Sequence, residues 1–302
     1  MHVYLPIAEM SVNVFAILGL GGAAGLLAGM FGVGGGFLLT PLLIFIGVSP
    51  SVAVATSANQ IIASSVSGFV THWRRQNVDV KMGLFLLAGG VVGSTLGVAL
   101  FRWLKQIGHV DLIISLAYVT FLGLIGLLMA RDSYRVYRKQ PASAPVSSRL
   151  RWLSQLPYPV AFPASRITIS ALIPLAVGLF VGVMVSLMGI GGGFFLVPAM
   201  IYLIGMPTTM VIGTSLFQII FITAHVTLLQ AITTQTVDIM LALLLLSGSV
   251  FGAQLGIRLG ARISGNLLRA MLAALVLGIA IKLAAGLLTP PDNIYSVGLL
   301  DE

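Results

Sequence analysis

The stretch Phe31-Gly-Val-Gly-Gly-Gly-Phe-Leu-Leu-Thr-Pro41 returns later in the chain as Met188-Gly-Ile-Gly-Gly-Gly-Phe-Phe-Leu-Val-Pro198. Each copy follows a long apolar run and opens a short one. Three adjacent glycines are costly inside a continuous helix, because glycine loses more backbone entropy on folding than any other residue. Each triplet is also followed by a proline, which cannot donate a helical hydrogen bond. We therefore interpret the two stretches as paired helix breaks within a membrane.

The composition supports a membrane environment. Of the 302 residues, 58% are hydrophobic and only 8% are charged, whereas soluble domains carry about 25% charged residues. The apolar runs are long and uninterrupted, which favours helices over a membrane barrel. The chain has no cysteine, so disulfides and cysteine-based metal sites are excluded. We predict neither a cofactor nor a metal site.

Apolar segments occur ten times along the chain. The second segment of each half is too short to span a bilayer, which takes about 20 residues. Because each short segment begins at its glycine triplet, it is expected to be a broken or re-entrant helix, buried in protein or lining a cavity. The fold class is therefore an all-α integral membrane protein, with about eight full transmembrane helices plus two short ones, or ten helices in all. The expected segments are 12–31, 37–48, 52–71, 81–101, 110–130, 168–188, 194–205, 209–230, 237–259 and 267–288.

The two halves of the chain match beyond the glycine triplets. Thr56-Ser-Ala-Asn-Gln-Ile-Ile62 corresponds to Thr214-Ser-Leu-Phe-Gln-Ile-Ile220, and Asn77-Val-Asp79 corresponds to Thr236-Val-Asp238. The offset between matching positions stays between 157 and 159 residues. Such self-similarity indicates a duplication with five segments in each half. We divide the chain into a first membrane repeat (1–130), a basic linker (131–166) and a second membrane repeat (167–302).

Basic residues predict the orientation of the repeats, because cytoplasmic loops carry an excess of Lys and Arg. The loop after the third segment contains Arg74, Arg75 and Lys81 and is expected to be cytoplasmic. Its counterpart, 231–238, carries no positive charge and is expected outside. Equivalent loops then lie on opposite sides of the membrane, which is the signature of an inverted repeat.

The same rule places the remaining loops. The linker 131–166 is rich in arginine and is expected in the cytoplasm, with both termini in the periplasm of a bacterial inner membrane. Arg102 and Lys105 then fall on the outer side, against the rule. The net charge of +8 is attributed to these loops rather than to nucleic-acid binding, because the chain has no soluble basic domain.

The glycine triplets are candidates for anion binding. A half-helix that begins at such a triplet presents unpaired backbone N–H groups and the positive end of its dipole. Two half-helices, one from each repeat, would aim these ends at a common midplane site. The alternative is that glycine only allows close helix packing. The residues concerned are Gly34, Gly35, Gly36, Gly191, Gly192 and Gly193.

A polar stripe follows each short segment and supplies further candidates. Gln60 and Gln218 lie about halfway along their segments and therefore near the bilayer midplane. A buried amide without a partner is costly, so these groups either bind a ligand or form hydrogen bonds between helices. Asn59 has only Phe217 at the matching position, which suggests an asymmetric site. The substrate-binding candidates are Thr56, Ser57, Asn59, Gln60, Thr214, Ser215 and Gln218.

Ionisable residues are nearly absent from the apolar segments. His225 lies well inside one and is a candidate proton carrier or ligand donor, or a packing residue. All eight acidic residues lie near segment ends, in the linker or near the termini, and Asp79 and Asp238 are expected to cap helices. Cation-coupled transporters usually carry intramembrane carboxylates. A site of neutral donors suits an anion instead.

The duplicated Gly-x-Gly-Gly-Gly-Phe-x-x-x-Pro, followed by Thr-Ser-x-x-Gln, resembles the TauE/SafE family of sulfite exporters, also called the TSUP permeases. The resemblance covers nearly the whole chain except the linker and the termini. It implies transport of sulfur-containing anions, including sulfite and organosulfonates such as sulfoacetate, across a bacterial inner membrane.

The leading hypothesis is therefore a secondary transporter, in the exporting direction, with a small anion and the lipid bilayer as partners. An anion channel differs only in whether both gates can open together. A non-transporting membrane assembly factor for a sulfur-handling system is a second alternative. An enzyme is not expected, because no nucleophile, base or metal cluster is apparent. A homodimer is left open.

Overall fold

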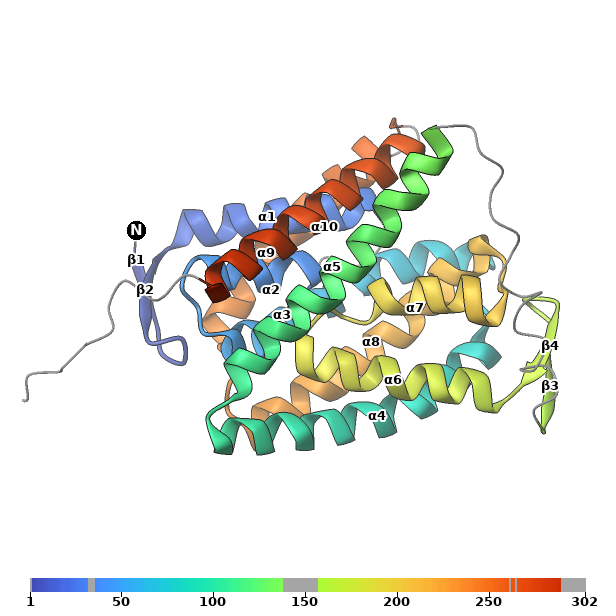
Figure 1. The fold of residues 1–302 in the computed structure, drawn as a ribbon, viewed down its shortest axis with the longest axis horizontal. Helices are drawn as coiled ribbons and strands as arrows, with labels where there is room; N and C mark the ends of the chain where they lie inside the picture. Colours follow the sequence, from blue (N-terminus) through green and yellow to red (C-terminus); the bar gives the residue numbers. More distant parts are fainter. Residues whose placement is uncertain (1, 32–35, 138–156, 261, 264, 289–302) are drawn as a thin grey trace, which may run out of the picture.

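The structure is a computed structural model that describes residues 2–31, 36–137, 157–260, 262–263 and 265–288. The first half of the chain begins with a β-hairpin and continues with five helices (Figure 1). In order, these elements are β1 (His2–Leu5), β2 (Met10–Asn13), α1 (Val14–Phe31), α2 (Gly36–Phe45), α3 (Pro50–Arg74), α4 (Val80–Ile107) and α5 (Val110–Tyr137).

The second half repeats this order of elements. A second hairpin precedes another series of helices, in which the short second helix passes into a π-helical segment. The elements are β3 (Pro159–Phe162), β4 (Ile167–Ser170), α6 (Leu172–Met188), α7 (Gly193–Ala199), the π-helical segment Met200–Ile204, α8 (Thr208–Thr233), α9 (Ile239–Gly260) and α10 (Gly265–Leu288).

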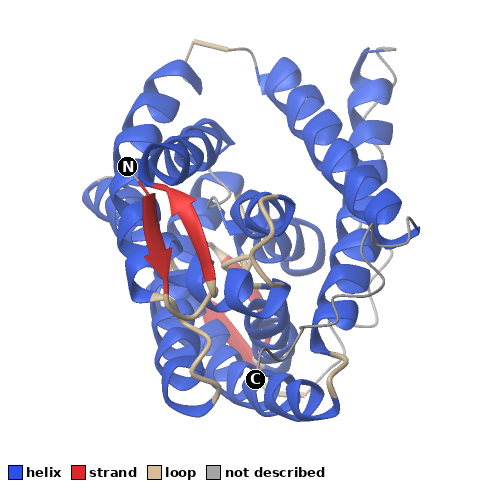
Figure 2. Ribbon diagram, turned by 90° about the vertical axis from the view of Figure 1, so that its left-hand side faces the viewer, coloured by secondary structure: helices blue, strands red, loops and turns tan. Residues whose placement is uncertain are grey.

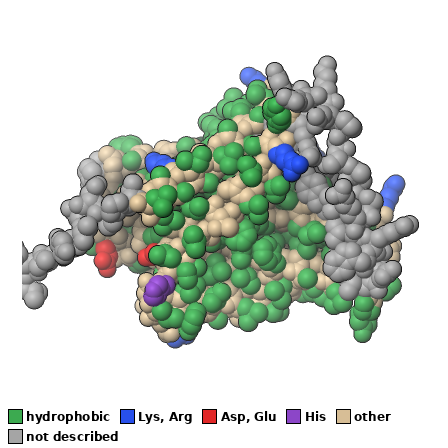
Figure 3. All heavy atoms as spheres, in the orientation of Figure 1, with side chains coloured by type: hydrophobic (Ala, Val, Ile, Leu, Met, Phe, Trp, Pro, Cys, Tyr) green, Lys and Arg blue, Asp and Glu red, His purple; other side chains and the backbone are tan. Residues whose placement is uncertain are grey.

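The helices confirm the predicted class of all-α membrane protein. Within the described residues, α4, α5, α8, α9 and α10 contain stretches long and apolar enough to cross a bilayer, and α1, α2 and α6 are shorter apolar helices. The face drawn in Figure 3 carries many hydrophobic side chains and few Lys and Arg side chains. Both short helices begin at the last glycine of their triplets, as predicted.

Helices of the two halves exchange equivalent contacts. The first helix of each half packs along the fourth helix of the other, so that α1 lies against α9 and α6 lies against α4. The third helices pair with each other, as do the fifth helices. Glycines allow these close approaches, since an ideal Cβ at Gly25 would lie 2.3 Å from the carbonyl oxygen of Ser249. Two equivalent halves related by a twofold rotation would produce this pairing.

The two hairpins are features that the sequence analysis did not predict. Each is antiparallel, with four-residue strands, and each directly precedes the first helix of its half. They lie at opposite ends of the helix bundle (Figures 1 and 2). The segment expected as a linker, 131–166, therefore contains the end of α5 and the strand β3, and residues 138–156 lie outside the described part of the chain.

Candidate functional site at the two helix breaks

The two glycine stretches meet inside the bundle. Phe37 and Phe194, which directly follow the two triplets, stack with ring centroids 4.9 Å apart and an interplanar angle of 14°. Both rings are buried. An ideal Cβ at Gly36 would lie 2.8 Å from the carbonyl oxygen of Gly189, so the two breaks touch at a position where only glycine fits. Gly34 and Gly35 lie outside the described residues.

The second break depends on left-handed backbone conformations. Gly189, Gly191 and Gly192 have φ angles of +64°, +75° and +77°. Residues with a side chain adopt such angles at a cost of roughly 1–2 kcal/mol each. Gly192 occupies the N-cap position of α7, and Gly193 is its first residue. The repeated glycines therefore turn the chain between α6 and α7 within the protein interior.

Side chains from three other helices complete the end of α6. A helix that ends inside a membrane leaves carbonyl groups without water to accept from. Here Gln230 Nε2 donates to Ser186 O (3.0 Å), the Tyr118 hydroxyl donates to Met188 O, and Ser57 Oγ lies within 3.4 Å of Gly189 O.

Two of these capping residues were not singled out from the sequence. Tyr118 and Gln230 lie in apolar runs outside the repeated motif, so no pattern marked them. Ser57, by contrast, was predicted to bind substrate, and its hydroxyl also contacts Thr40 Oγ1 at 2.7 Å. All four of the side chains in this group are fully buried. The break is therefore held by a buried polar cluster.

Gln60 is less well paired than this cluster, in which Gln230 Oε1 lacks a partner among the described residues. Gln60 has no exposed surface, and neither of its amide atoms has a hydrogen-bond partner among the described residues. Gln218 is 1% exposed; its Nε2 donates to Leu86 O (3.3 Å), and its Oε1 has no partner in the described part of the chain. The carbonyl of Leu86 can only accept, which fixes the orientation of the Gln218 amide. Asn59 likewise has a buried Nδ2 atom with no partner in the part of the chain described.

A buried polar atom without a partner costs about 1–3 kcal/mol. Such atoms are few in native proteins, and each calls for an explanation such as a ligand or a bound water. Gln60 carries two of them, next to Ile61, whose side chain contacts both glycine breaks at Gly36 and Gly191. The glutamine motif is thus brought to the same region as the breaks.

The two predicted threonines make a symmetric pair of contacts. Thr56 Oγ1 accepts a hydrogen bond from the backbone N–H of Asp238 (3.1 Å), and Thr214 Oγ1 accepts one from Asp79 (2.9 Å). Each hydroxyl oxygen therefore supports the start of a helix in the opposite half. Their part in substrate binding stays a prediction. Ser215 Oγ donates to the backbone carbonyl of Ile212 (2.9 Å).

Asp79 and Asp238 are N-caps, as predicted. One carboxylate oxygen of Asp79 accepts from Met82 N (2.9 Å), and one of Asp238 accepts from Leu241 N (3.0 Å). The second oxygen of each carboxylate binds the turn of a hairpin that belongs to the other half. Asp79 Oδ2 accepts from Ser165 N (3.1 Å) and Ser165 Oγ (2.5 Å), and Asp238 Oδ2 accepts from Ile7 N (3.1 Å) and Ala8 N (3.4 Å).

His225 lies two helical turns beyond Gln218 on α8. Its Nδ1 is 2.9 Å from Ser94 Oγ on α4, and Ser94 Oγ also donates to Val91 O (3.1 Å). The imidazole is half-buried.

Within the described part of the chain, no three His, Cys, Asp or Glu side chains gather as metal ligands would.

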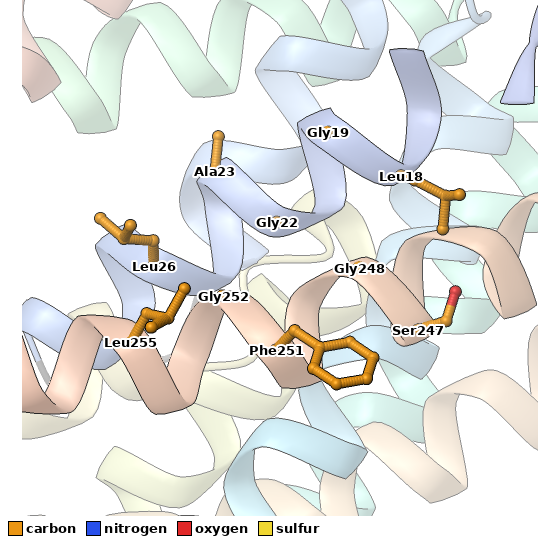
Figure 4. A pocket seen from close by; sticks show the side chains of 10 residues that line it. All are labelled: Leu18, Gly19, Gly22, Ala23, Leu26, Ser247, Gly248, Phe251, Gly252 and Leu255. Atoms are coloured by element: carbon orange, nitrogen blue, oxygen red, sulfur yellow. The ribbon is translucent and has the colours of Figure 1, made fainter. Parts of the chain in front are cut away.

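The surface of the described residues includes a groove between α1 and α9 and another between α4 and α8, and the repeated glutamines line neither of them. The groove between α1 and α9 has a volume of about 530 Å³ and is lined by glycines and apolar side chains such as Leu18 and Phe251 (Figure 4). Its lining holds no charged side chain, so it does not suit an anion. The groove between α4 and α8, of about 340 Å³, includes Arg102.

A family model and several known membrane proteins match the chain. The family model for sulfite exporter TauE/SafE matches residues 17–283. The chain is 30% identical to the probable membrane transporter protein YjnA of Bacillus subtilis, over 80% of this chain and 87% of that protein. It is 27% identical to a probable membrane transporter protein of Xylella fastidiosa, over 68% of this chain and 70% of that protein.

A plant protein matches a shorter part of the chain. Sulfite exporter TauE/SafE family protein 3 of Arabidopsis thaliana is 33% identical over 34% of this chain and 22% of that protein. No solved structure matches the chain significantly.

Proposed function

Because the chain belongs to the sulfite exporter TauE/SafE family of membrane proteins, we propose that it is a secondary transporter of small sulfur-containing anions. Sulfite and organosulfonates such as sulfoacetate are the proposed substrates. The family description supports export as the direction. Transport is assigned to a bacterial inner membrane, with the termini in the periplasm and the linker in the cytoplasm.

The observation that carries this proposal is the unpaired amide of Gln60. The surrounding polar groups Ser57, Tyr118 and Gln230 are used to complete the helix break. Gln60 has no such use, although burial without a partner destabilises the folded protein. Gln60 destabilises the ligand-free protein, and its neighbour Ile61 contacts both helix breaks, so we explain its unpaired amide by a ligand that binds there for part of a cycle.

The chemistry around Gln60 suits an oxyanion. Amide N–H groups and glycine-rich backbone donate hydrogen bonds, and the helix dipoles favour negative charge at helix N-termini. The two buried carboxylates nearest the repeated motifs, Asp79 and Asp238, are each fixed by several backbone N–H donors at a helix start. They are therefore poor candidates for carrying a coupling cation.

Gln218 narrows the class of anion. One hydrogen of its Nε2 is engaged by Leu86 O, and its free Oε1 is an acceptor. An acceptor complements a ligand that carries an O–H or N–H donor as well as anionic oxygens. Hydrogen sulfite and aminosulfonates such as taurine have both kinds of group. Sulfate, thiosulfate and the sulfoacetate dianion at neutral pH offer oxygens or sulfur that only accept, so Gln218 favours sulfite over sulfoacetate among the proposed substrates.

The proposed mechanism is alternating access around the two breaks. Two observations support inverted repeats at 1–130 and 167–302. Helices of one half pair with helices of the other (α1 with α9, α6 with α4), and the hairpins lie at opposite ends of the bundle. In inverted-repeat transporters the substrate site lies at the repeat interface, formed by broken helices. Movement of one part of the bundle against another would then open Gln60 and Gln218 to each side in turn.

The test is anion-dependent thermal stabilisation of the purified protein, followed by flux into liposomes. A ligand that binds only the folded state raises its apparent stability by mass action. We expect stabilisation by sulfite or taurine that exceeds the effect of sulfate, and loss of that difference in the Gln60→Ala and Gln218→Ala variants. If the wild type responds equally to all anions, or if both variants respond as the wild type does, the midplane site is rejected.

A further inference from the structure

The groove between α4 and α8 contains a positive charge that the transport proposal has not used. Arg102, Trp103 and Gln106 line it from α4, and Thr95 and Thr233 contribute hydroxyl groups. Arg102 is exposed, and it forms no ion pair with any carboxylate that the structure describes. A guanidinium offers five N–H donors in a planar fork that matches an oxyanion.

Lys105, which follows Arg102 on α4, has a structural role. Lys105 Nζ donates to Thr234 O (2.9 Å), at the residue that ends α8. A lysine in this position satisfies a carbonyl at the helix C-terminus and interacts favourably with the helix dipole. Arg102 and Lys105 both oppose the expected charge bias of an outer loop, but only Lys105 has a structural partner that accounts for it.

Further polar groups lie along the interface of α4 and α8 beyond the residues that line the groove. On α4, Gly90, Ser94, Val98 and Arg102 follow at intervals of four residues and form a stripe that turns gradually around the helix, from buried positions to the exposed Arg102. On the α8 side, Gln218 Nε2 lies 3.0 Å from an ideal Cβ at Gly90, His225 Nδ1 lies 2.9 Å from Ser94 Oγ, and Leu229 and Thr233 line the groove.

The hydroxyl groups of the groove already donate hydrogen bonds within the protein, so a bound anion would depend on other donors such as Arg102. Thr95 Oγ1 donates to Val91 O (2.8 Å), and Thr233 Oγ1 donates to Leu229 O (2.6 Å). Their protons are therefore engaged. The remaining donors are the guanidinium of Arg102, the amide of Gln106 and the indole N–H of Trp103.

We propose that this groove is an outer vestibule that binds the transported oxyanion after it leaves the midplane during export. Arg102 holds the sulfite or sulfonate group at the mouth, and the His225–Ser94 pair is the polar position between Gln218 and the groove. The assignment of the ligand to a sulfur oxyanion rests on the proposed function. A phospholipid headgroup presents the same tetrahedral oxyanion chemistry, so the experiment separates these two sources.

The first measurement is the concentration dependence of anion flux into liposomes, with the anion supplied on either side. Loss of a hydrogen bond to a charged group costs about 1.5–3 kcal/mol, which corresponds to about a tenfold to hundredfold change in affinity. For Arg102→Gln we therefore expect the KM measured from the groove side to rise at least about tenfold. The ratio of maximal rate to KM should fall by the same factor in both directions, because a substitution cannot change the equilibrium of transport. Arg102→Lys restores part of the loss. Lys105→Gln is the matched control, with the same change of charge, and leaves KM unchanged.

The second measurement reads the groove directly and does not depend on transport. In a Trp73→Phe, Trp152→Phe background, Trp103 is the remaining tryptophan, because the chain has three. Iodide, an anionic quencher, should reach its indole better than neutral acrylamide does. Sulfite should compete with iodide, and Arg102→Gln should remove both the iodide preference and the competition.

The flux and quenching measurements separate failure of the transport proposal from failure of the groove proposal. If the wild type moves no sulfur anion but sulfite still competes at Trp103, the transport proposal fails while anion binding in the groove stands. If sulfite does not compete in wild-type protein, or if KM is the same in Arg102→Gln, the vestibule is rejected. If iodide access instead changes only between vesicles of phosphatidylcholine alone and vesicles with phosphatidylglycerol, a lipid headgroup occupies the groove and the proposal is again rejected.

Discussion

Gln60 is the residue at which stability and the proposed function conflict most clearly. Methionine has nearly the same length and shape and needs no hydrogen bonds, so Gln60→Met would remove two unpaired polar atoms from a buried position. We expect the anion-free variant to be more stable to unfolding by about 1–3 kcal/mol. It should also lose the stabilisation that sulfite or taurine gives the wild type. Thermal melts in detergent, with and without anion, measure both effects.

Gln230 provides the matched control for this substitution. It is also a buried glutamine, but its Nε2 completes the end of α6 by donating to Ser186 O. Gln230→Met should therefore lower the free energy of unfolding by up to about 1–3 kcal/mol, because Ser186 O loses its partner. Removal of the unpaired Gln230 Oε1 offsets part of this cost. Its response to anions should stay at the wild-type level. Equal behaviour of the two variants would mean that Gln60 is also structural.

The threonines of the repeated motif allow a separate prediction. Thr56→Val and Thr214→Val keep the side-chain shape but remove the oxygen that accepts from Asp238 N or Asp79 N. Each change should destabilise the protein by about 1–3 kcal/mol, and the two costs should add, because the contacts share no partner. We expect anion-dependent stabilisation to persist. If it disappears while the protein remains folded, the hydroxyls bind substrate as the sequence suggested.

At this scale the sequence predicted residue types better than it predicted contacts. The repeat of Thr-Ser-x-x-Gln marked Gln60 and Gln218, and the Asp residues before apolar runs marked the N-caps. Contacts between distant segments carry no such mark: Thr56 meets Asp238 only after the whole bundle forms. Tyr118 lies in an apolar run without a repeated counterpart, so its role in capping α6 was not predicted.

The helix breaks are the elements on which the site depends, and Gly192 tests them. Its φ of +77° disfavours any residue with a side chain, and an ideal Cβ would lie 2.8 Å from Val181 Cγ1. Gly192→Ala should cost about 1–2 kcal/mol from backbone strain alone. Gly19→Ala is the control, because nothing lies within 4 Å of its ideal Cβ and alanine favours the helix by up to about 1 kcal/mol. Equal melting temperatures for the two variants would contradict this account of the second break.

Element boundaries show what periodicity can and cannot predict. The long helices were expected from uninterrupted apolar runs, and the short ones from the glycine triplets. The π-helical segment Met200–Ile204 follows Pro198, whose missing N–H interrupts the regular hydrogen-bond ladder, but a proline alone does not specify this outcome. The hairpins have strands of four residues, too short for alternation to stand out from a neighbouring apolar segment.

For the whole molecule, the two halves hold each other together through equivalent contacts. Each hairpin turn binds the Asp that caps the fourth helix of the other half, and that helix packs along the helix that follows the hairpin. Each half depends on the other for the hydrogen bonds to the second carboxylate oxygen of its capping Asp. We infer that the halves fold as one unit, and that the internal duplication is preserved by reciprocal packing as well as by the proposed site.

The position of the hairpins makes the inverted repeat testable. They lie at opposite ends of the bundle, and the helices run between these ends (Figures 1 and 2), so inverted halves would place one hairpin on each side of the membrane. The chain has no native cysteine, which allows single cysteines to be labelled without background. Ser11 in β2 and Thr168 in β4 are both exposed and suit this substitution.

In intact cells, a membrane-impermeant maleimide should label Ser11→Cys, because the first hairpin is expected in the periplasm. It should label Thr168→Cys only after the membrane is opened, because the second hairpin adjoins the basic linker, which the charge bias places in the cytoplasm. Labelling of both sites from the same side would mean an even number of crossings between them and would reject the inverted repeat. Reversal of both results would keep the inverted repeat but turn the protein over, which would move the Arg102 groove to the cytoplasmic face.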